Sequence, residues 1–126
     1  MRNIRQSLHM ILLCIVFLFV CACSKAPFHS LSPEEAEELI RTEECIIVDT
    51  RSADEYAQSH IKNAVNIPYA SLQNMGPEEL PDTKTVILIY GETDELSEAA
   101  AERLSLLGYS NVYLFGSYDS WKGERE

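Results

Sequence analysis

Apolar and polar positions follow two different periodicities along residues 32–122, one typical of strands and one typical of helices. Four short runs of apolar, mostly β-branched or aromatic residues predict strands, and the strongest of them is TVILIY at 85–90. The predicted strands cover residues 45–48, 64–67, 85–90 and 111–115. Because the runs are apolar at consecutive positions, they are typical of strands that are buried on both faces of a parallel sheet.

Amphipathic stretches between these runs predict helices. Ser32, Pro33 and Glu35 form a helix start, because serine caps the first turn, proline suits the first helical position and the glutamate completes a capping box. Ser52 and Glu55 repeat the serine–glutamate spacing. The predicted helices cover residues 32–40, 52–58 and 95–107, with a closing helical turn over 118–122. Strands that alternate with helices predict one α/β domain with a central parallel sheet and helices on both faces.

Two loops have the position in which parallel α/β sheets bind ligands. Such sheets place their sites at the carboxyl ends of the strands. Residues 50–54 and residues 91–96 follow the two most apolar predicted strands. The residues of these loops do not by themselves indicate a reaction.

The first residues have the pattern of a secretory signal peptide. Arg2 and Arg5 precede a continuous apolar stretch at 10–22, which is shorter than the ~20 residues that a membrane-spanning helix needs. The sequence VCAC at 20–23 resembles the end of a bacterial lipoprotein signal, in which an aliphatic and a small residue precede the cysteine that receives the lipid. A plain cleaved signal and an uncleaved anchor are the alternatives.

This resemblance divides the chain into a lipoprotein signal peptide (1–22), the lipidated Cys23 with its tether (23–30) and a folded domain (31–126). It implies a protein of the bacterial cell envelope, anchored by lipid to a membrane on its extracytoplasmic side. The chain has 20 acidic and 10 basic residues. Because an acidic domain is repelled by anionic headgroups, the lipid rather than charge has to hold it at the membrane.

Charge and cysteine content exclude several kinds of partner and site. The net charge is −10 and no cluster of lysine and arginine occurs, which excludes nucleic acid as a partner. Cys14, Cys21 and Cys23 lie in or next to the apolar stretch, which leaves Cys45 for the folded part. Neither a disulfide framework nor a cysteine-based zinc site can then form. We expect a monomer without a cofactor or a metal.

Residues 28–123 resemble the rhodanese (thiosulfate sulfurtransferase) family through a series of motifs. In chain order these are VDTR at 48–51, EY at 55–56, SHIKNAVNIP at 59–68, GYSNVY at 108–113, and finally Gly116 and Trp121. The resemblance implies a rhodanese-like domain and scaffold roles for four residues. Asp49 and Arg51 would form an ion pair, His60 would be packed and hydrogen-bonded, and Trp121 would lie beneath the last strand. The tyrosines are scattered and predict no aromatic cage.

The same resemblance implies that the catalytic residue is missing. Active members carry a cysteine immediately after the strand that ends here at Tyr90, as the first residue of a six-residue loop. Backbone N–H groups at the helix start stabilise its thiolate and persulfide. Here the loop keeps its length, but its first residue is glycine, which has no side chain to carry sulfur. The loop residues are Gly91, Glu92, Thr93, Asp94, Glu95 and Leu96.

No other residue of the chain is a good substitute for that cysteine. Cys45 begins its strand and is expected at the opposite end of the sheet from Gly91, where it is interpreted as a small buried hydrophobe. Thr93 is the only hydroxyl of the loop and has no identifiable base. The acids of the loop either repel an anionic sulfur donor or complement the helix dipole. Both roles disfavour sulfur transfer.

Three hypotheses of function follow. The leading one is a membrane-anchored, catalytically inactive rhodanese-like domain that acts as a binding or regulatory module, with a protein partner at residues 91–96 and at a rim formed by Arg51. The alternative is a sulfurtransferase that works with an external thiol or through an unrecognised residue. The third is a cation site formed by Glu92, Asp94 and Glu95.

Overall fold

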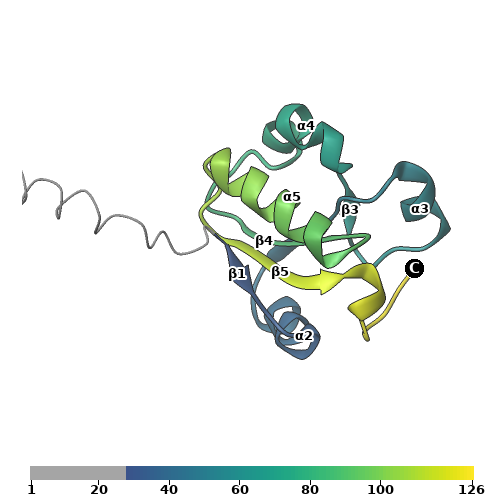
Figure 1. Cartoon of the computed structure of the whole chain (residues 1–126). Helices are drawn as coiled ribbons and strands as arrows, with labels where there is room; N and C mark the ends of the chain where they lie inside the picture. Colours follow the sequence, from purple (N-terminus) through teal and green to yellow (C-terminus); the bar gives the residue numbers. More distant parts are fainter. Residues whose placement is uncertain (1–27) are drawn as a thin grey trace, which may run out of the picture.

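Five strands form one sheet in the computed structural model, which describes residues 28–126 (Figure 1). The order across the sheet is β1-β5-β4-β2-β3, and every neighbouring pair is parallel. The strands are β1 (His29–Ser30), β2 (Cys45–Asp49), β3 (Val65–Asn66), β4 (Val86–Gly91) and β5 (Val112–Ser117). The parallel sheet predicted from the apolar runs is confirmed.

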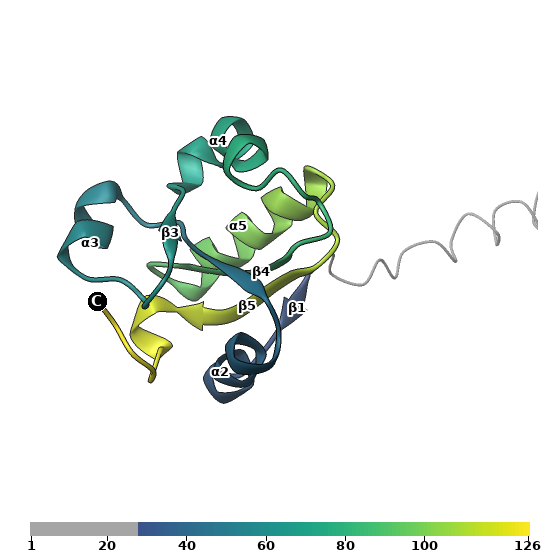
Figure 2. The same ribbon diagram turned by 180° about the vertical axis from the view of Figure 1, so that it is seen from behind.

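Helices cover both faces of this sheet, as predicted. They are α2 (Pro33–Thr42), α3 (Ala53–Gln58), α4 (Leu72–Glu79) and α5 (Asp94–Leu106), with 3-10 turns η1 (Tyr69–Ser71) and η2 (Tyr118–Ser120). Figures 1 and 2 show α4 and α5 on one side of the sheet and α2 on the other, while α3 lies beyond β3. The carboxyl ends of β2 and β4 are therefore framed by α3 and by the start of α5.

Successive residues of the central strand β4 pack against opposite layers of helices. Ile87 belongs to a buried cluster with Leu104 of α5, and Leu88 belongs to a second buried cluster with Ala36 of α2. All four side chains are 0% exposed. This alternation is what the two-residue period of a strand requires when both faces are covered. It holds the end of β4 in a fixed place.

The helix starts follow the predicted local chemistry. Both serine–glutamate capping boxes are present, at Ser32 and at Ser52. α5 begins at Asp94, one residue before the predicted start, because Thr93 caps it. After α5, Gly108 has a φ of 99°, a left-handed conformation that glycine adopts at helix ends.

Three elements were not predicted: the short turn η1, the helix α4 and the strand β1. α4 contains Gly76 and Pro77, which disfavour a helix interior, yet it is held by packing of Leu72 and Leu80, which are 0% and 1% exposed. At Gly76 the backbone approaches α5, since a Cβ there would lie 3.8 Å from a Leu104 methyl carbon. β1 has two polar residues and so no apolar run. It also takes residues 29 and 30 out of the expected tether and into the sheet.

The expectations for the first residues concern a part of the chain outside the described residues. The signal peptide at 1–22 and the lipidated Cys23 both fall there. Within residues 28–126, no helix is long and apolar enough to cross a membrane.

Candidate functional site

The two loops singled out by the sequence meet at the carboxyl ends of β2 and β4. Asp49 and Tyr90 are register partners, so the two strands end side by side. Thr50 then donates two hydrogen bonds to the Tyr90 carbonyl, from its N–H at 2.9 Å and from its hydroxyl at 2.8 Å. The loop that follows β2 is thereby fixed against the loop that begins at Gly91.

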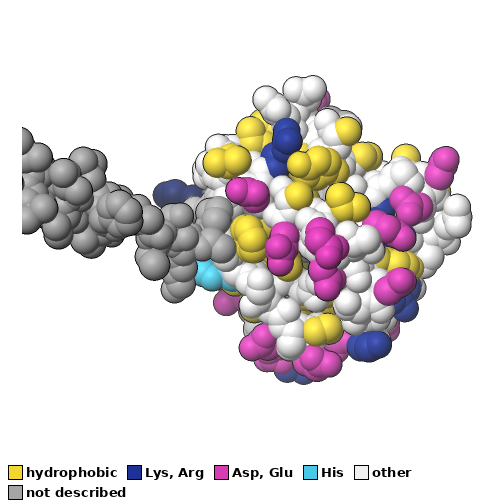
Figure 3. All heavy atoms as spheres, viewed as in Figure 1, with side chains coloured by type: hydrophobic (Ala, Val, Ile, Leu, Met, Phe, Trp, Pro, Cys, Tyr) yellow, Lys and Arg dark blue, Asp and Glu magenta, His cyan; other side chains and the backbone are white. Residues whose placement is uncertain are grey.

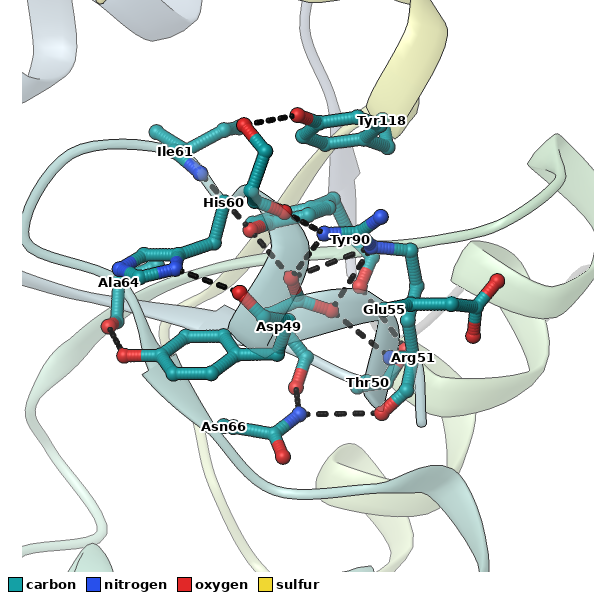
Figure 4. A network of polar contacts seen from close by, with 12 residues as sticks. Asp49, Thr50, Arg51, Glu55, His60, Ile61, Ala64, Asn66, Tyr90 and Tyr118 are labelled. Carbon is teal, nitrogen blue, oxygen red and sulfur yellow. Dashed lines mark hydrogen bonds and ion pairs between the residues drawn. The ribbon is translucent and has the colours of Figure 1, made fainter. Parts of the chain in front are cut away.

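Asp49 and Arg51 form a buried ion pair at this edge (Figure 4). The Arg51 Nη2 lies 2.8 Å from the Asp49 Oδ2, with side-chain exposures of 5% and 0%. Nη2 also donates to the Ser59 carbonyl at 2.7 Å. Burial lowers the pKa of the Arg51 guanidinium, but the hydrogen bonds and charge of Asp49 outweigh burial and raise that pKa above its usual value. The expected ion pair is present, and it joins β2 to the turn after α3.

Tyr90 adds a second donor to the Asp49 carboxylate. Its hydroxyl donates to Oδ2 at 2.6 Å and accepts the N–H of Ile61 at 3.1 Å (Figure 4). Burial, followed by the hydrogen bond to Asp49, raises the pKa of the Tyr90 phenol well above its usual value. Tyr90 stays protonated at neutral pH and serves as a fixed connection between β4 and the segment before β3.

Arg51 is enclosed by aromatic rings from distant parts of the chain. Its guanidinium lies 3.8 Å from the centroid of Tyr118 and 5.8 Å from that of Tyr90. The expectation that the tyrosines stay scattered is therefore wrong for these two, because η2 returns the chain to the end of β4. The expectation of an Arg51 rim is wrong as well. Arg51 is 7% exposed and its guanidinium packs against the Tyr118 ring, so it offers no rim to a partner.

His60 and Trp121 are packed where the resemblance implied. The His60 ring stacks on Tyr56 at 3.8 Å, its Nδ1 lies 2.8 Å from the Tyr56 carbonyl, and its Nε2 lies 3.4 Å from a Glu126 carboxylate oxygen. Trp121 is 4% exposed and packs against Phe115. Both residues join the chain's last segment to the sheet edge.

The second half of the loop at residues 91–96 is the first turn of α5. Gly91 is buried, and its N–H donates to the Ser97 hydroxyl at 2.8 Å. Thr93 caps the helix by accepting the Leu96 N–H at 3.3 Å, so its hydroxyl has a structural role. A cap of this kind uses donors that a helix start would otherwise offer to an anion.

The space beside Gly91 is already filled. A Cβ at this position would lie 3.1 Å from the Thr50 hydroxyl oxygen, 3.3 Å from the Ser97 backbone nitrogen and 3.4 Å from the Ser97 hydroxyl oxygen. A side chain here requires these neighbours to move by a few tenths of an ångström. Thr50 and Ser97 are the residues that sequence reasoning did not place here. Their positions in the sequence were the available signal, since Thr50 directly follows β2 and Ser97 directly follows residues 91–96.

The acidic side chains of the loop do not form a cation site. Within residues 28–126, no three His, Cys, Asp or Glu side chains are grouped so that they could hold a metal ion. The third hypothesis is therefore wrong: Glu92 lies before the helix cap Thr93, and Asp94 and Glu95 follow in the first turn of α5 without a third ligand from the described part of the chain grouped with them.

Glu92 instead faces Glu55 of α3. A hydrogen bond between the two carboxyl groups, followed by burial and the charge of Glu55, raises the pKa of Glu92. Hydrogen bonds from Ser52 hold the pKa of Glu55 below its usual value. Glu55 and the exposed Glu92 therefore form a carboxyl pair between α3 and residues 91–96, a surface that we call the mouth, and Glu92 takes up a proton first as the pH falls.

Cys45 lies far along the sheet from Gly91. It is the first residue of β2 and pairs with Val86, the first residue of β4, whereas Gly91 is the last. Burial, followed by the charge of Glu43, raises the pKa of its thiol. The side chain is half-buried rather than fully buried, and at neutral pH it is a protonated thiol with weak nucleophilic character.

Comparison with known proteins gives one consistent result. A model of the rhodanese-like domain matches residues 32–124. Thiosulfate sulfurtransferase GlpE of Coxiella burnetii is 32% identical over 96 residues, which are 75% of this chain and 88% of that protein. GlpE of Pseudomonas entomophila is also 32% identical over 96 residues, which are 75% and 85% of the two chains.

The structural comparison agrees. The solved structure of a rhodanese with anions from E. coli has a TM-score of 0.62 and 25% sequence identity, and the match covers 66% of this chain and 98% of that one. The parallel sheet, the Asp49–Arg51 pair at its carboxyl edge and these matches lead to one assignment. The chain belongs to the rhodanese-like domain family and is homologous to sulfurtransferases.

Proposed function

We propose that this chain is a rhodanese-like domain that does not transfer sulfur and acts as a binding or regulatory module, held by a lipid on Cys23 at the extracytoplasmic side of a bacterial membrane. The observation that carries the proposal is Gly91 at the end of β4. In sulfur transfer of this family, a thiolate at that place attacks the outer sulfur of a donor and keeps it as a persulfide. A glycine has no atom for this step.

The surroundings of Gly91 support the same proposal. A Cβ at position 91 would lie 3.1 Å from the Thr50 hydroxyl oxygen and 3.3 Å from the Ser97 nitrogen, so these residues leave little room for a side chain. The N–H of Gly91 is bonded to Ser97, and the start of α5 is capped by Thr93. The relative from E. coli is described as a rhodanese with anions. In this chain the N–H groups of Gly91, Leu96 and Ser97 already have partners inside the protein.

Negative charge at the mouth also repels the anionic sulfur donors of the family. Glu92, Asp94 and Glu95 are exposed at the start of α5, and Glu55 faces Glu92 from α3. Thiosulfate carries two negative charges and would be repelled from this mouth. The same exposed loop, with Leu96 46% exposed among the acids, is suited to contact a protein partner.

The first prediction concerns sulfur loading. After incubation of the full chain with thiosulfate, we expect peptide mass spectrometry to find no persulfide on Cys45, because burial and Glu43 keep its thiol protonated. Coxiella burnetii GlpE, treated in parallel, is the positive control. A persulfide on any cysteine of this chain, with release of sulfite, would mean that an unrecognised nucleophile works and that the chain is a sulfurtransferase.

The second prediction concerns the anchor. Protein extracted from bacterial membranes should have lost residues 1–22 and gained a diacylglyceryl mass on Cys23, because VCAC at 20–23 resembles a lipoprotein cleavage site. Intact-mass analysis measures both changes at once. Cys23→Ser should abolish the lipid mass, whereas Cys21→Ser should leave it in place. A soluble product with an unmodified N-terminus would contradict the lipid anchor.

A further inference from the structure

A groove between α4 and α5 lies on the face of the molecule that carries α5. It has a volume of about 430 Å³, and its walls come from η1, α4 and α5. Tyr69 and Gln73 line one wall, and Ala99, Arg103 and Leu106 line the other. The volume falls within the range of pockets that accept a ligand or a few side chains of a partner.

One end of the groove is apolar and exposed. Leu106 is 81% exposed, and Leu107 beside it is half-buried. Figure 3 shows hydrophobic side chains gathered where α4 and α5 meet, with acidic side chains along the lower side of α5. An exposed leucine next to an apolar groove is typical of a contact site for an apolar side chain.

A row of acids follows the groove along α5. Glu95, Glu98 and Glu102 are exposed at spacings of three and four residues, so they lie on one side of the helix. Among the ion pairs of residues 28–126, none includes these three residues. Their negative charge faces outward beside the apolar end.

Arg103 does not neutralise this row, because it is held in the groove wall. Its guanidinium lies 5.1 Å from the centroid of Tyr69, and its Nη1 donates to the Gln73 side chain at 3.2 Å. The groove therefore has three parts: the cationic Arg103 side chain held in its wall, an apolar end at Leu106, and an acidic border.

We infer that this groove binds a basic amphipathic helix of a partner protein. Its apolar side chains would cover Leu106, and its lysine or arginine side chains would meet Glu98 and Glu102, in the manner of a helix that lies in a groove. A second copy of this chain fits less well, since it would bring the same acidic row against itself. Leu106, Glu98 and Glu102, which the partner helix would contact, lie outside residues 91–96, so the inference stands whether or not that loop binds a partner.

The test uses the full chain in phosphatidylcholine nanodiscs, with empty nanodiscs as the blank. The probe is a synthetic helical peptide with leucines on one face and lysines on its flanks, and the control peptide carries glutamates in place of the lysines. Calorimetry should give micromolar binding of the lysine peptide, weakened by added salt, and no binding of the glutamate peptide. Leu106→Ser and the double change Glu98→Gln, Glu102→Gln should each weaken binding by at least ~10-fold.

Matched variants separate this site from other surfaces. Val65→Ser removes a 38% exposed apolar side chain from β3 at the sheet edge and should leave the affinity unchanged. Because Leu106 is so exposed, Leu106→Ser should leave the circular dichroism spectrum unchanged. Equal affinity of wild type and Leu106→Ser, binding of both peptides, or no binding overturns the inference. A dimer in sedimentation that Leu106→Ser dissociates would assign the groove to a second copy instead.

Discussion

Arg51→Ala should lower the free energy of unfolding by about 3–5 kcal/mol, because it leaves a buried carboxylate without its counter-charge. Asp49 is 0% exposed and keeps the Tyr90 hydroxyl as a neutral side-chain donor. The change also removes the guanidinium from the Tyr118 ring, 3.8 Å away. Urea denaturation followed by the fluorescence of Trp121, the single tryptophan of the chain, measures the loss.

An exposed ion pair provides the matched control for this variant. Arg41 pairs with Glu38 on α2, and their side chains are 74% and 53% exposed. Arg41→Ala should change the free energy of unfolding by less than ~1 kcal/mol. Arg51→Lys should lie between the two, since lysine keeps the charge but neither the forked hydrogen bonds nor the stacking. If Arg51→Ala is as stable as Arg41→Ala, the pair is not what holds the carboxyl edge together.

Gly91→Cys alone should give little sulfurtransferase activity. The new Cβ lies 3.1 Å from the Thr50 hydroxyl oxygen and 3.3 Å from the Ser97 nitrogen, so the start of α5 has to shift. Glu92, Asp94 and Glu95 raise the pKa of the new thiol and repel a dianionic donor. Rates of thiosulfate-to-cyanide sulfur transfer and the pH dependence of thiol alkylation measure both effects.

Removing the acids should then restore part of the rate. In the Gly91→Cys background, Glu92→Gln with Asp94→Asn and Glu95→Gln should raise turnover by at least ~10-fold, which corresponds to ~1.4 kcal/mol of barrier. The same three changes with Gly91 retained should give no activity and serve as the control. A single Gly91→Cys variant with the full rate of a sulfurtransferase would show that the acids have no influence and that one substitution accounts for the loss.

The elements that could be predicted are those whose signal is local. Consecutive apolar residues in β2 and β4 and the capping boxes at Ser32 and Ser52 depend on near neighbours in the chain, and they were found. α4 could not be predicted, because Gly76 and Pro77 oppose a helix and its stability comes from packing against α5. β1 exists only because β5 offers it a parallel edge.

In the candidate site, too, contacts between residues near in sequence could be predicted, and contacts between distant segments could not. Asp49 and Arg51 are two residues apart and belong to one motif, so their ion pair was expected. Tyr118 comes from the far end of the chain, and its ring reaches Arg51 only through the placement of η2. Thr50 from the loop after β2 and Ser97 from α5 both lie beside Gly91, and Glu55 meets Glu92 across the same mouth. Such contacts are properties of the folded domain rather than of any segment.

Turnover of thiosulfate and cyanide by the unmodified full chain tests the central claim most directly. Formation of thiocyanate should be measured beside Coxiella burnetii GlpE at equal protein concentration, with and without an added small thiol. Because Gly91 offers no nucleophile and its surroundings are filled, we predict a rate equal to that of buffer in both conditions. Thiocyanate formation that scales with the concentration of this chain would contradict the account. A rate that appears only with the added thiol would contradict it too, and would identify an enzyme that uses an external thiol as its nucleophile.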